Sequence, residues 1–159
     1  MNIFVLHEDP WEAAQLQCDK HVVKMCLETA QLLSTNWPSV GCAAPYKPTH
    51  YNHPCSRWVR IHHENYAWLV EHFRALLSEY AHRYGKRHKC RDVLDLIEET
   101  HPAHLLEPPD DILDMDFVYC GVESCRRASV VASYRELYKL KAKTIDMRWT
   151  KREKPEWMP

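Results

Sequence analysis

Residues able to carry chemistry are concentrated in one short stretch, which contains Asp19, Lys20, His21, Lys24 and Glu28. On a helix, positions three, four and seven apart share a face, so His21, Lys24 and Glu28 could converge on one ligand. Lysine side chains bind phosphate, and an imidazole or a carboxylate can transfer protons. The alternative is a solvated polar face whose ion pairs contribute about 0.3 kcal/mol each. Spacing alone does not separate these two interpretations.

A second polar group stands immediately before an expected helix start. His50, Asn52 and His53 precede Pro54, and Arg57 follows within one turn. Two histidines could bind a metal, but metal sites need a full ligand set, and the sequence has no HExxH and no paired CxxC motif. We therefore expect no metal and no cofactor. The His and Asn side chains are expected to cap the helix or to hydrogen-bond a substrate.

Basic residues gather at positions 86–91, which include Lys86 and His88, and again between about 134 and 152, where aromatic residues alternate with them. Basic groups neutralise phosphates, and Trp or Tyr rings can stack on exposed bases. Between residues 91 and 126 there is no Lys or Arg, and acidic residues accumulate. A net charge of −1 can therefore hide a positive face.

Helices are the elements expected to position these residues, because only three glycines are present, too few for the tight turns of a β-sandwich or barrel. Residues 2–6 are the one convincing extended run. A long helix is predicted from Pro10 to about Thr35, with Asp9 as its N-cap and Glu12 completing a capping box.

A second long helical stretch is predicted from Pro54 to a C-cap at Gly85, and it could break near residues 62–64. Shorter helices are expected over 92–100 and roughly 126–144. The predicted fold is therefore mainly α: a compact bundle of two long and two shorter helices with a short extended N-terminal segment. We expect a single domain, residues 1–159, with a basic and aromatic tail from about 145 in which Trp149 and Trp157 pack onto the domain.

A helical wheel divides the first long helix into two arcs. The arc expected to face the core holds Val22, Val23, Cys26, Ala30 and Leu33, and the opposite arc holds Gln17, His21, Lys24, Glu28 and Gln31. Asp19 falls among the apolar residues, where an isolated charge is costly and needs a partner. Arg83 or His72, on the apolar stripe of the second helix, is the expected partner. The sequence leaves open whether they form a packing network or the floor of a site.

Several protein classes are disfavoured by composition. No apolar run approaches the roughly 20 residues that span a bilayer, and no basic stretch leads into an apolar secretory signal. Seven cysteines, an odd number, fit reduced thiols better than a disulfide framework. We expect a soluble, cytoplasmic protein with no membrane association, and we favour a monomer.

The chain as a whole resembles a family of small, mostly uncharacterised phage-encoded proteins. The resemblance rests on NIFVL (2–6), DKHVVKM (19–25), HYNHP (50–54), EY (79–80), RYGK (83–86) with His88, WTKR (149–152) and PEW (155–157). It is weakest between about residues 115 and 129. It implies a protein of phage origin, acting in the host cell cytoplasm.

The layout is also similar to the phage pyrimidine-dimer DNA glycosylases of endonuclease V type. In those helical proteins a short extended N-terminus leads into a long helix, and the second long helix resembles residues 72–85 here. The similarity implies that an N-terminal α-amine attacks a sugar carbon and forms a Schiff base. It further implies a glutamate on the long helix that serves the chemistry, and basic neighbours that bind phosphates. An α-amine ordinarily has a pKa near 8, which leaves a usable unprotonated fraction.

Carried over by position, Lys20 and Lys24 match the phosphate-binding arginines, whereas the glutamate position falls on His21, with Asp19 two residues earlier. Because Asn2 is bulky, we expect Met1 to be retained and to supply the amine. The catalytic candidates are Met1, Asp19, His21 and Glu28. The phosphate- or nucleic-acid-binding candidates are Lys20, Lys24, His50, Asn52, His53, Arg57, Arg83, Lys86 and His88.

The predicted function is a DNA glycosylase and abasic-site lyase acting on damaged or modified bases, with DNA as partner. Two alternatives stay open. One is an enzyme acting on nucleotides or modified bases through a site of histidines and carboxylates. The other is a non-catalytic nucleic-acid-binding phage protein.

Overall fold

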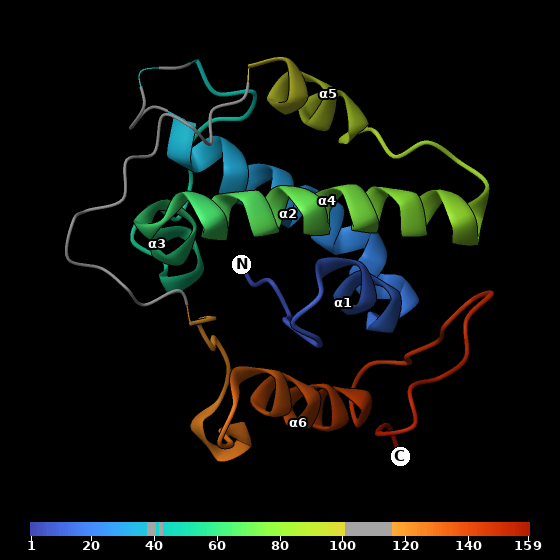
Figure 1. Ribbon diagram of the computed structural model, residues 1–159. Coiled ribbons are helices and arrows are strands. Elements are labelled where there is room, and N and C mark those ends of the chain that lie inside the picture. The colour runs from blue at the N-terminus through green and yellow to red at the C-terminus, as the bar shows by residue number, and fades with distance from the viewer. Residues whose placement is uncertain (38–40, 42, 101–115) are drawn as a thin grey trace.

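The computed structural model describes residues 1–37, 41, 43–100 and 116–159. Within these ranges it contains helices and no strand, which confirms the mainly α prediction (Figure 1). The elements are α1 (Pro10–Leu16), α2 (Asp19–Asn36), α3 (Pro54–Ile61), α4 (His63–Tyr84), α5 (Arg91–Thr100), a single 3₁₀ turn η3 (Glu123–Cys125) and α6 (Val130–Ala142). None of these described helices is long and apolar enough to cross a bilayer.

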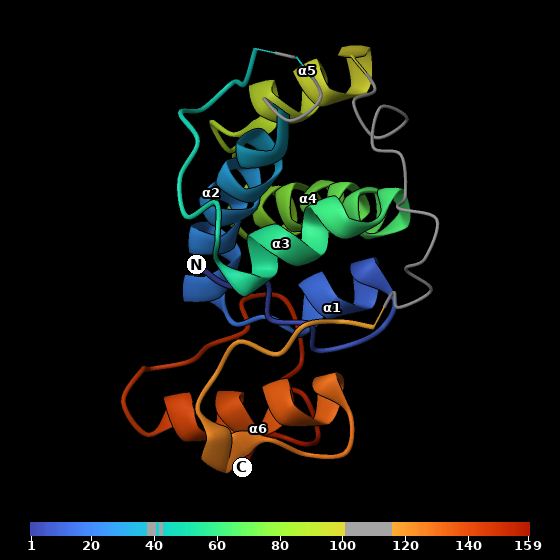
Figure 2. The ribbon, with the colours of Figure 1, turned by 90° about the vertical axis from the view of Figure 1, so that its left-hand side faces the viewer.

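The long helix α4 is the centre of the arrangement, because α1, α2, α3 and α5 all pack against it. Leu69, Phe73 and Leu76 of α4 are fully buried in this layer. Helix α6 lies on the other side of the N-terminal segment, which runs between α6 and the other helices (Figures 1 and 2). The start of the chain is therefore enclosed on two sides.

The N-terminal segment, residues 1–6, is a buried non-helical run rather than a regular strand. Ile3 to Leu6 are at most 5% exposed. Phe4 has a φ of 56°, a left-handed conformation that is uncommon for a bulky residue. Its ring stacks on His21 at 4.5 Å and meets the rings of Tyr134 and Tyr138 of α6 edge-on. These contacts fix the direction in which the chain enters the fold.

Helix α1 begins where the sequence predicts. Asp9 Oδ1 accepts hydrogen bonds of 2.9 Å from the N–H groups of Trp11 and Glu12, and Pro10 occupies the first helical position. The capping-box prediction for Glu12 is wrong, because the Asp9 N–H donates to His7 Nδ1 at 3.0 Å and Glu12 is exposed. A histidine before the cap thus replaces the expected glutamate.

The break in the second helical stretch falls at His62, inside the predicted interval. His62 has an extended backbone (φ −144°, ψ 140°), and its Nδ1 accepts from the Glu64 N–H to cap α4. At the other end, Gly85 adopts a φ of 65° and donates its N–H to Ala81 O at 2.8 Å. The C-cap prediction is therefore confirmed, and it needs a glycine because of the positive φ.

The prediction of one continuous helix from Pro10 to Thr35 is wrong. Helix α1 ends at Leu16, and the backbone at Gln17 and Cys18 is extended before α2 starts at Asp19. Hydrogen bonds that an unbroken helix would make are replaced from the other end of the chain. Trp149 Nε1 donates to Leu16 O at 2.9 Å, and the Asp19 N–H donates to Arg148 O at 2.8 Å.

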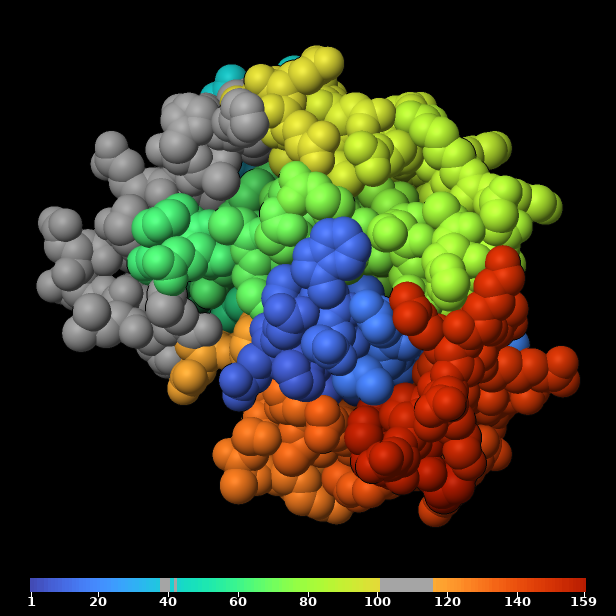
Figure 3. Space-filling view, turned by 45° about the vertical axis from the view of Figure 1, so that its right-hand side comes forward, coloured from blue at the N-terminus to red at the C-terminus, as the bar shows by residue number. Residues whose placement is uncertain are grey.

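Helix α6 begins at an N-cap supplied by Ser129. Residues 145–159, which follow it, pack against the rest of the protein. Figure 3 shows this segment lying against α1 and the end of α4. Arg152 bonds both carboxylate oxygens of Glu79 at 2.9–3.0 Å, and Lys151 Nζ donates to His82 O at 2.8 Å. Trp149 is buried and Trp157 is partly buried against the core, which confirms the expected packing of both tryptophans.

Candidate active site

Helix α2 places Glu28 beside the first residue of the chain. The Met1 amine nitrogen lies 3.8 Å from Glu28 Oε2, and the Asn2 N–H donates to the same oxygen at 2.9 Å. The other carboxylate oxygen is 3.0 Å from Lys24 Nζ, one helical turn earlier. The Glu28 carboxylate, whose side chain is only 12% exposed, is therefore surrounded by an amine, a backbone N–H and an ammonium group.

Met1 is anchored by its side chain and open at its backbone. The side chain is 3% exposed, whereas the residue as a whole is partly exposed. The accessible surface of Met1 therefore lies mainly on the main chain, which carries the amine. This arrangement holds the amine in place and leaves it reachable from solvent.

Three further side chains surround this position. His53 caps α3, its Nδ1 accepting from the Cys55 N–H at 3.2 Å. The Cys55 Sγ lies 3.3 Å from the Sγ of Cys120, which belongs to the segment before α6. Asn2 Nδ2 donates to Cys120 O at 2.6 Å, so the N-terminal segment is tied directly to this thiol pair.

The positive Met1 amine affects the pKa values of these neighbouring groups. The pKa of the Cys120 thiol is lowered, first by a hydrogen bond from the Cys55 thiol and also by the positive Met1 amine. Burial lowers the pKa of His53, and the same amine lowers it further. The pKa of Cys55 is raised, because it is hydrogen-bonded to Cys120 and buried. Sequence reasoning missed both cysteines, since they lie 65 positions apart and form no motif.

His21 lies inside the protein, so its expected outward orientation is wrong. It is 6% exposed, its Nδ1 is 2.5 Å from the Tyr138 hydroxyl, and its ring stacks on Phe4. Burial first, and then the charges of Lys141 and Lys24, lower the pKa of His21 to about 4, which leaves the ring neutral at pH 7.

The wheel fails at His21 because the N-terminal segment and α6 give α2 a second buried side. Val23, expected in the core, is 41% exposed, and Gln17 is buried in the break between α1 and α2. The other residues of the predicted apolar arc, Val22, Cys26, Ala30 and Leu33, are buried as expected.

Asp19 is tied into a network between α2, α4 and the C-terminal segment. Its Oδ1 accepts from Arg83 Nη1 and from the Thr150 N–H, both at 2.9 Å, and its Oδ2 accepts from Thr150 Oγ1 at 2.7 Å. The predicted pairing of Asp19 with Arg83 is confirmed. Burial alone would raise the pKa of Asp19, but the hydrogen bonds from Thr150 and Arg83 outweigh it and lower the pKa.

This network is separate from the amine. Asp19 and Glu28 are nine positions apart on α2, which corresponds to about 13 Å along a helix. The Arg83 side chain is 0% exposed and also bonds Glu79 Oε1 at 2.7 Å. Its guanidinium therefore points into the protein, whereas the other basic candidates lie at the surface.

The exposed candidates lie on α2, at the start of α3 and in the loops before α3 and after α4. Lys24 is 66% exposed, and the loop after α4 lies next to the same helix because His88 is hydrogen-bonded to the Val23 backbone. His88 itself is partly exposed, as is His53. The exposed members are Lys20, Lys24, His50, Asn52, Arg57 and Lys86.

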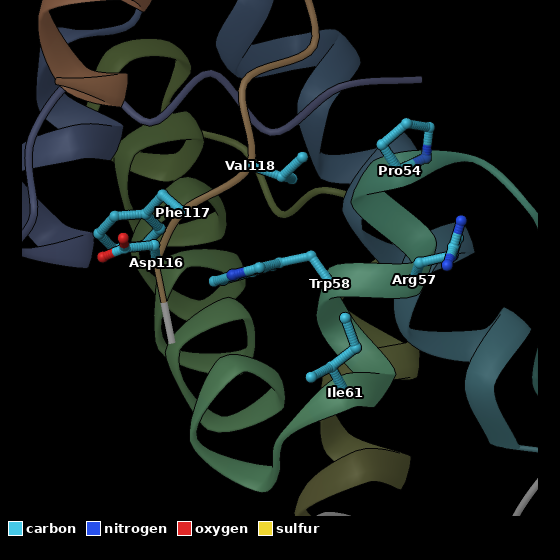
Figure 4. Close-up of a pocket in the computed structure, with 7 residues that line it drawn as sticks. All are labelled: Pro54, Arg57, Trp58, Ile61, Asp116, Phe117 and Val118. Carbon is cyan, nitrogen blue, oxygen red and sulfur yellow. The ribbon is translucent and has the colours of Figure 1, made fainter. Parts of the chain in front are cut away.

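A hollow of about 400 Å³ opens beside α3, one turn from His53. It is lined by Pro54, Arg57, Trp58, Ile61 and residues 116–118. Figure 4 shows the Trp58 side chain reaching from α3 towards Phe117, with Arg57 at the edge. The Trp58 and Phe117 rings are 5.6 Å apart, and the buried Trp58 Nε1 has no hydrogen-bond partner among the residues that the structure describes. The hollow is therefore lined mainly by apolar side chains, with Arg57 and Asp116 as its charged members.

A family model described as pyrimidine dimer DNA glycosylase matches residues 1–92. The matched region contains Met1, Glu28, His53 and the basic residues through His88, and it ends before Cys120 and α6. Neither a curated protein nor a solved structure matches the chain significantly.

Proposed function

The chain belongs to the pyrimidine dimer DNA glycosylase family, and we propose that it removes damaged or modified bases from DNA by using the Met1 α-amine as nucleophile and cleaving the resulting abasic site. DNA is the substrate that the family implies. The observation that carries the proposal is the 3.8 Å approach of the Met1 amine to the Glu28 carboxylate.

The proposed reaction begins when the neutral amine attacks C1′ of the damaged nucleotide. The bond from C1′ to the base breaks, and its electron pair leaves with the base, which takes up a proton. Glu28 then accepts a proton from the attached nitrogen and returns one to O4′ as the C1′–O4′ bond opens, which leaves an imine between Met1 and C1′. Loss of a C2′ proton then expels the 3′ phosphate and cleaves the strand.

Glu28 suits this proton transfer better than the other candidates. Both oxygens of Asp19 are occupied by Arg83 and Thr150, and Asp19 lies about two and a half turns of α2 from Glu28. His21 is buried, and one of its ring nitrogens is bound to Tyr138. Glu28 is the carboxylate that contacts the amine directly.

The exposed basic residues would hold the DNA backbone. Lys24 projects from α2 one turn before Glu28, and Lys20 lies one turn further back, about 12 Å from Glu28 along the helix. Lys24 can exchange its carboxylate partner for a phosphate because it is largely exposed. Arg57, exposed on α3, and Lys86, exposed in the loop after α4, would add further phosphate contacts. Arg83, buried in its ion pairs, takes no part in this role.

Borohydride trapping tests the proposal. Wild-type protein incubated with duplex DNA that carries a pyrimidine dimer or an abasic site should form a reduced covalent adduct, and peptide mass spectrometry should locate it on the terminal amine. Glu28→Gln keeps an acceptor for the Asn2 N–H and removes the proton carrier, so trapping should slow by about 100-fold. Glu12→Gln, an exposed carboxylate on α1, is the matched control and should trap normally.

Two results would contradict the proposal. An adduct on a lysine side chain would remove the Met1 amine from its role. Unchanged trapping by Glu28→Gln would leave the carboxylate as a tether for the N-terminus and nothing more.

A further inference from the structure

We propose that His53, Cys55 and Cys120 form a binding site for Zn²⁺ beside the N-terminus. Their donor atoms all lie within 4.8 Å of one another, and within the described residues no other group of His, Cys, Asp and Glu side chains is gathered in this way. The proposal is independent of the proposed glycosylase reaction, because it concerns the metal affinity of the folded protein.

The donor set fits zinc in kind. Two thiolates and one imidazole are typical zinc ligands, and they disfavour the hard cations Mg²⁺ and Ca²⁺. With Zn–S bonds of about 2.3 Å, two sulfurs in a tetrahedral site lie about 3.8 Å apart. Cys55 Sγ and Cys120 Sγ are 3.3 Å apart, so a small rotation of either side chain reaches that spacing.

Two nearby groups direct positive charge towards these thiols, and the incoming metal must displace the proton of the buried Cys55 thiol, whose pKa is raised. Cys55 is the second residue of α3, where the unpaired backbone N–H groups of the helix start stabilise negative charge. The Met1 amine, which acts electrostatically on both cysteines, adds a positive charge nearby. Three protein ligands leave the fourth tetrahedral position for a water molecule.

Binding would exchange one interaction for another at His53. One ring nitrogen now accepts from the Cys55 N–H to cap α3. Whichever nitrogen binds zinc, the other must carry the proton, so this cap is given up when the metal enters. In return the metal adds a bond between α3 and the segment before α6, which already meet at the thiol pair and at the Trp58–Phe117 ring contact.

Cobalt titration of the whole protein, kept reduced with a non-thiol reductant, tests the site. We expect one Co²⁺ per chain, with a thiolate charge-transfer band in the near ultraviolet and the visible bands of tetrahedral cobalt, all displaced by Zn²⁺. Zn²⁺ should also raise the melting temperature. Cys55→Ser and Cys120→Ser should each lose the charge-transfer band, and Cys125→Ser, a thiol in the same segment as Cys120, should bind like wild type.

His53→Asn is the sharpest variant, because asparagine can still cap α3 while the imidazole is lost. Binding should weaken at least about tenfold, since losing even an outer-sphere partner of a ligand costs that much. Melting curves without metal verify that each variant is folded. The proposal is overturned if no charge-transfer band forms, if the band survives in the Cys55 and Cys120 variants, or if Cys125→Ser abolishes it. Trapping of metal-free protein on DNA is scored separately, so failure of the metal site leaves the glycosylase proposal untouched.

Discussion

Replacing Arg83 with alanine should destabilise the protein and leave its DNA contacts in place. The Arg83 side chain is fully buried and donates to Glu79, to Asp19 and to the Gln15 carbonyl. Breaking a buried ion pair by removing one partner costs about 3–5 kcal/mol. Glu79 would keep Arg152 and Asp19 would keep Thr150, so we expect the lower end, about 3 kcal/mol.

For a chain of 159 residues, each kcal/mol corresponds to about 2–4 °C in melting temperature, so Arg83→Ala should melt about 6–12 °C below wild type. Urea unfolding followed by circular dichroism measures the free energy directly. Arg91→Ala is the control, because its pair with Asp95 is 40% and 44% exposed and should contribute less than about 1 kcal/mol.

DNA binding by the folded Arg83→Ala variant completes the test. Affinity and its dependence on salt should match wild type, since a buried guanidinium releases no counterions from DNA. A loss of stability below about 1 kcal/mol, together with weaker and less salt-dependent DNA binding, would refute this reasoning. Arg83 would then contact phosphate, as the sequence alone predicts.

Two more predictions concern protonation and DNA affinity. His21 and His72 are buried with pKa values lowered to about 4, chiefly by burial, whereas an unfolded histidine titrates near 6.5. The unfolded state therefore binds more protons between these values, so the stability is fully present above about pH 6.5 and falls as pH drops towards 4; melting temperatures from pH 7.5 to 5 should show this decline, with a shallower slope in His21→Phe. Lys20→Ala should reduce the salt slope of DNA binding by about one, whereas Lys143→Ala, on an exposed turn after α6, should leave the slope unchanged.

The sequence predicts best those features that residues within one helical turn decide. Asp9 and Pro10 start α1, His62 separates α3 from α4, and Gly85 ends α4, each through hydrogen bonds to positions two to four residues away. The Asp19–Arg83 pair was also predictable, because a charge on an apolar arc requires a partner and the second helix offered one.

Features decided by distant partners escape such reasoning. The break between α1 and α2 depends on Arg148 and Trp149, more than 125 positions away along the chain. His21 is buried because Tyr138, 117 positions away, packs over it. In the candidate site, Met1 and Glu28 could be named from sequence, but their pairing requires the path of residues 1–6. The pairing of Cys55 with Cys120 had no sequence signal.

The long-range hydrogen bonds of residues 148–152 affect how fast the chain folds. Their hydrogen bonds to Leu16, Asp19, Glu79 and His82 span 69 to 133 positions. Helical proteins usually fold fast because their contacts are local, and closing such long loops carries an entropic cost before any contact forms. We therefore expect folding slower than for a simple bundle of this length. The break between α1 and α2 should therefore become fully stable only once residues 148 and 149 have been synthesised and have docked.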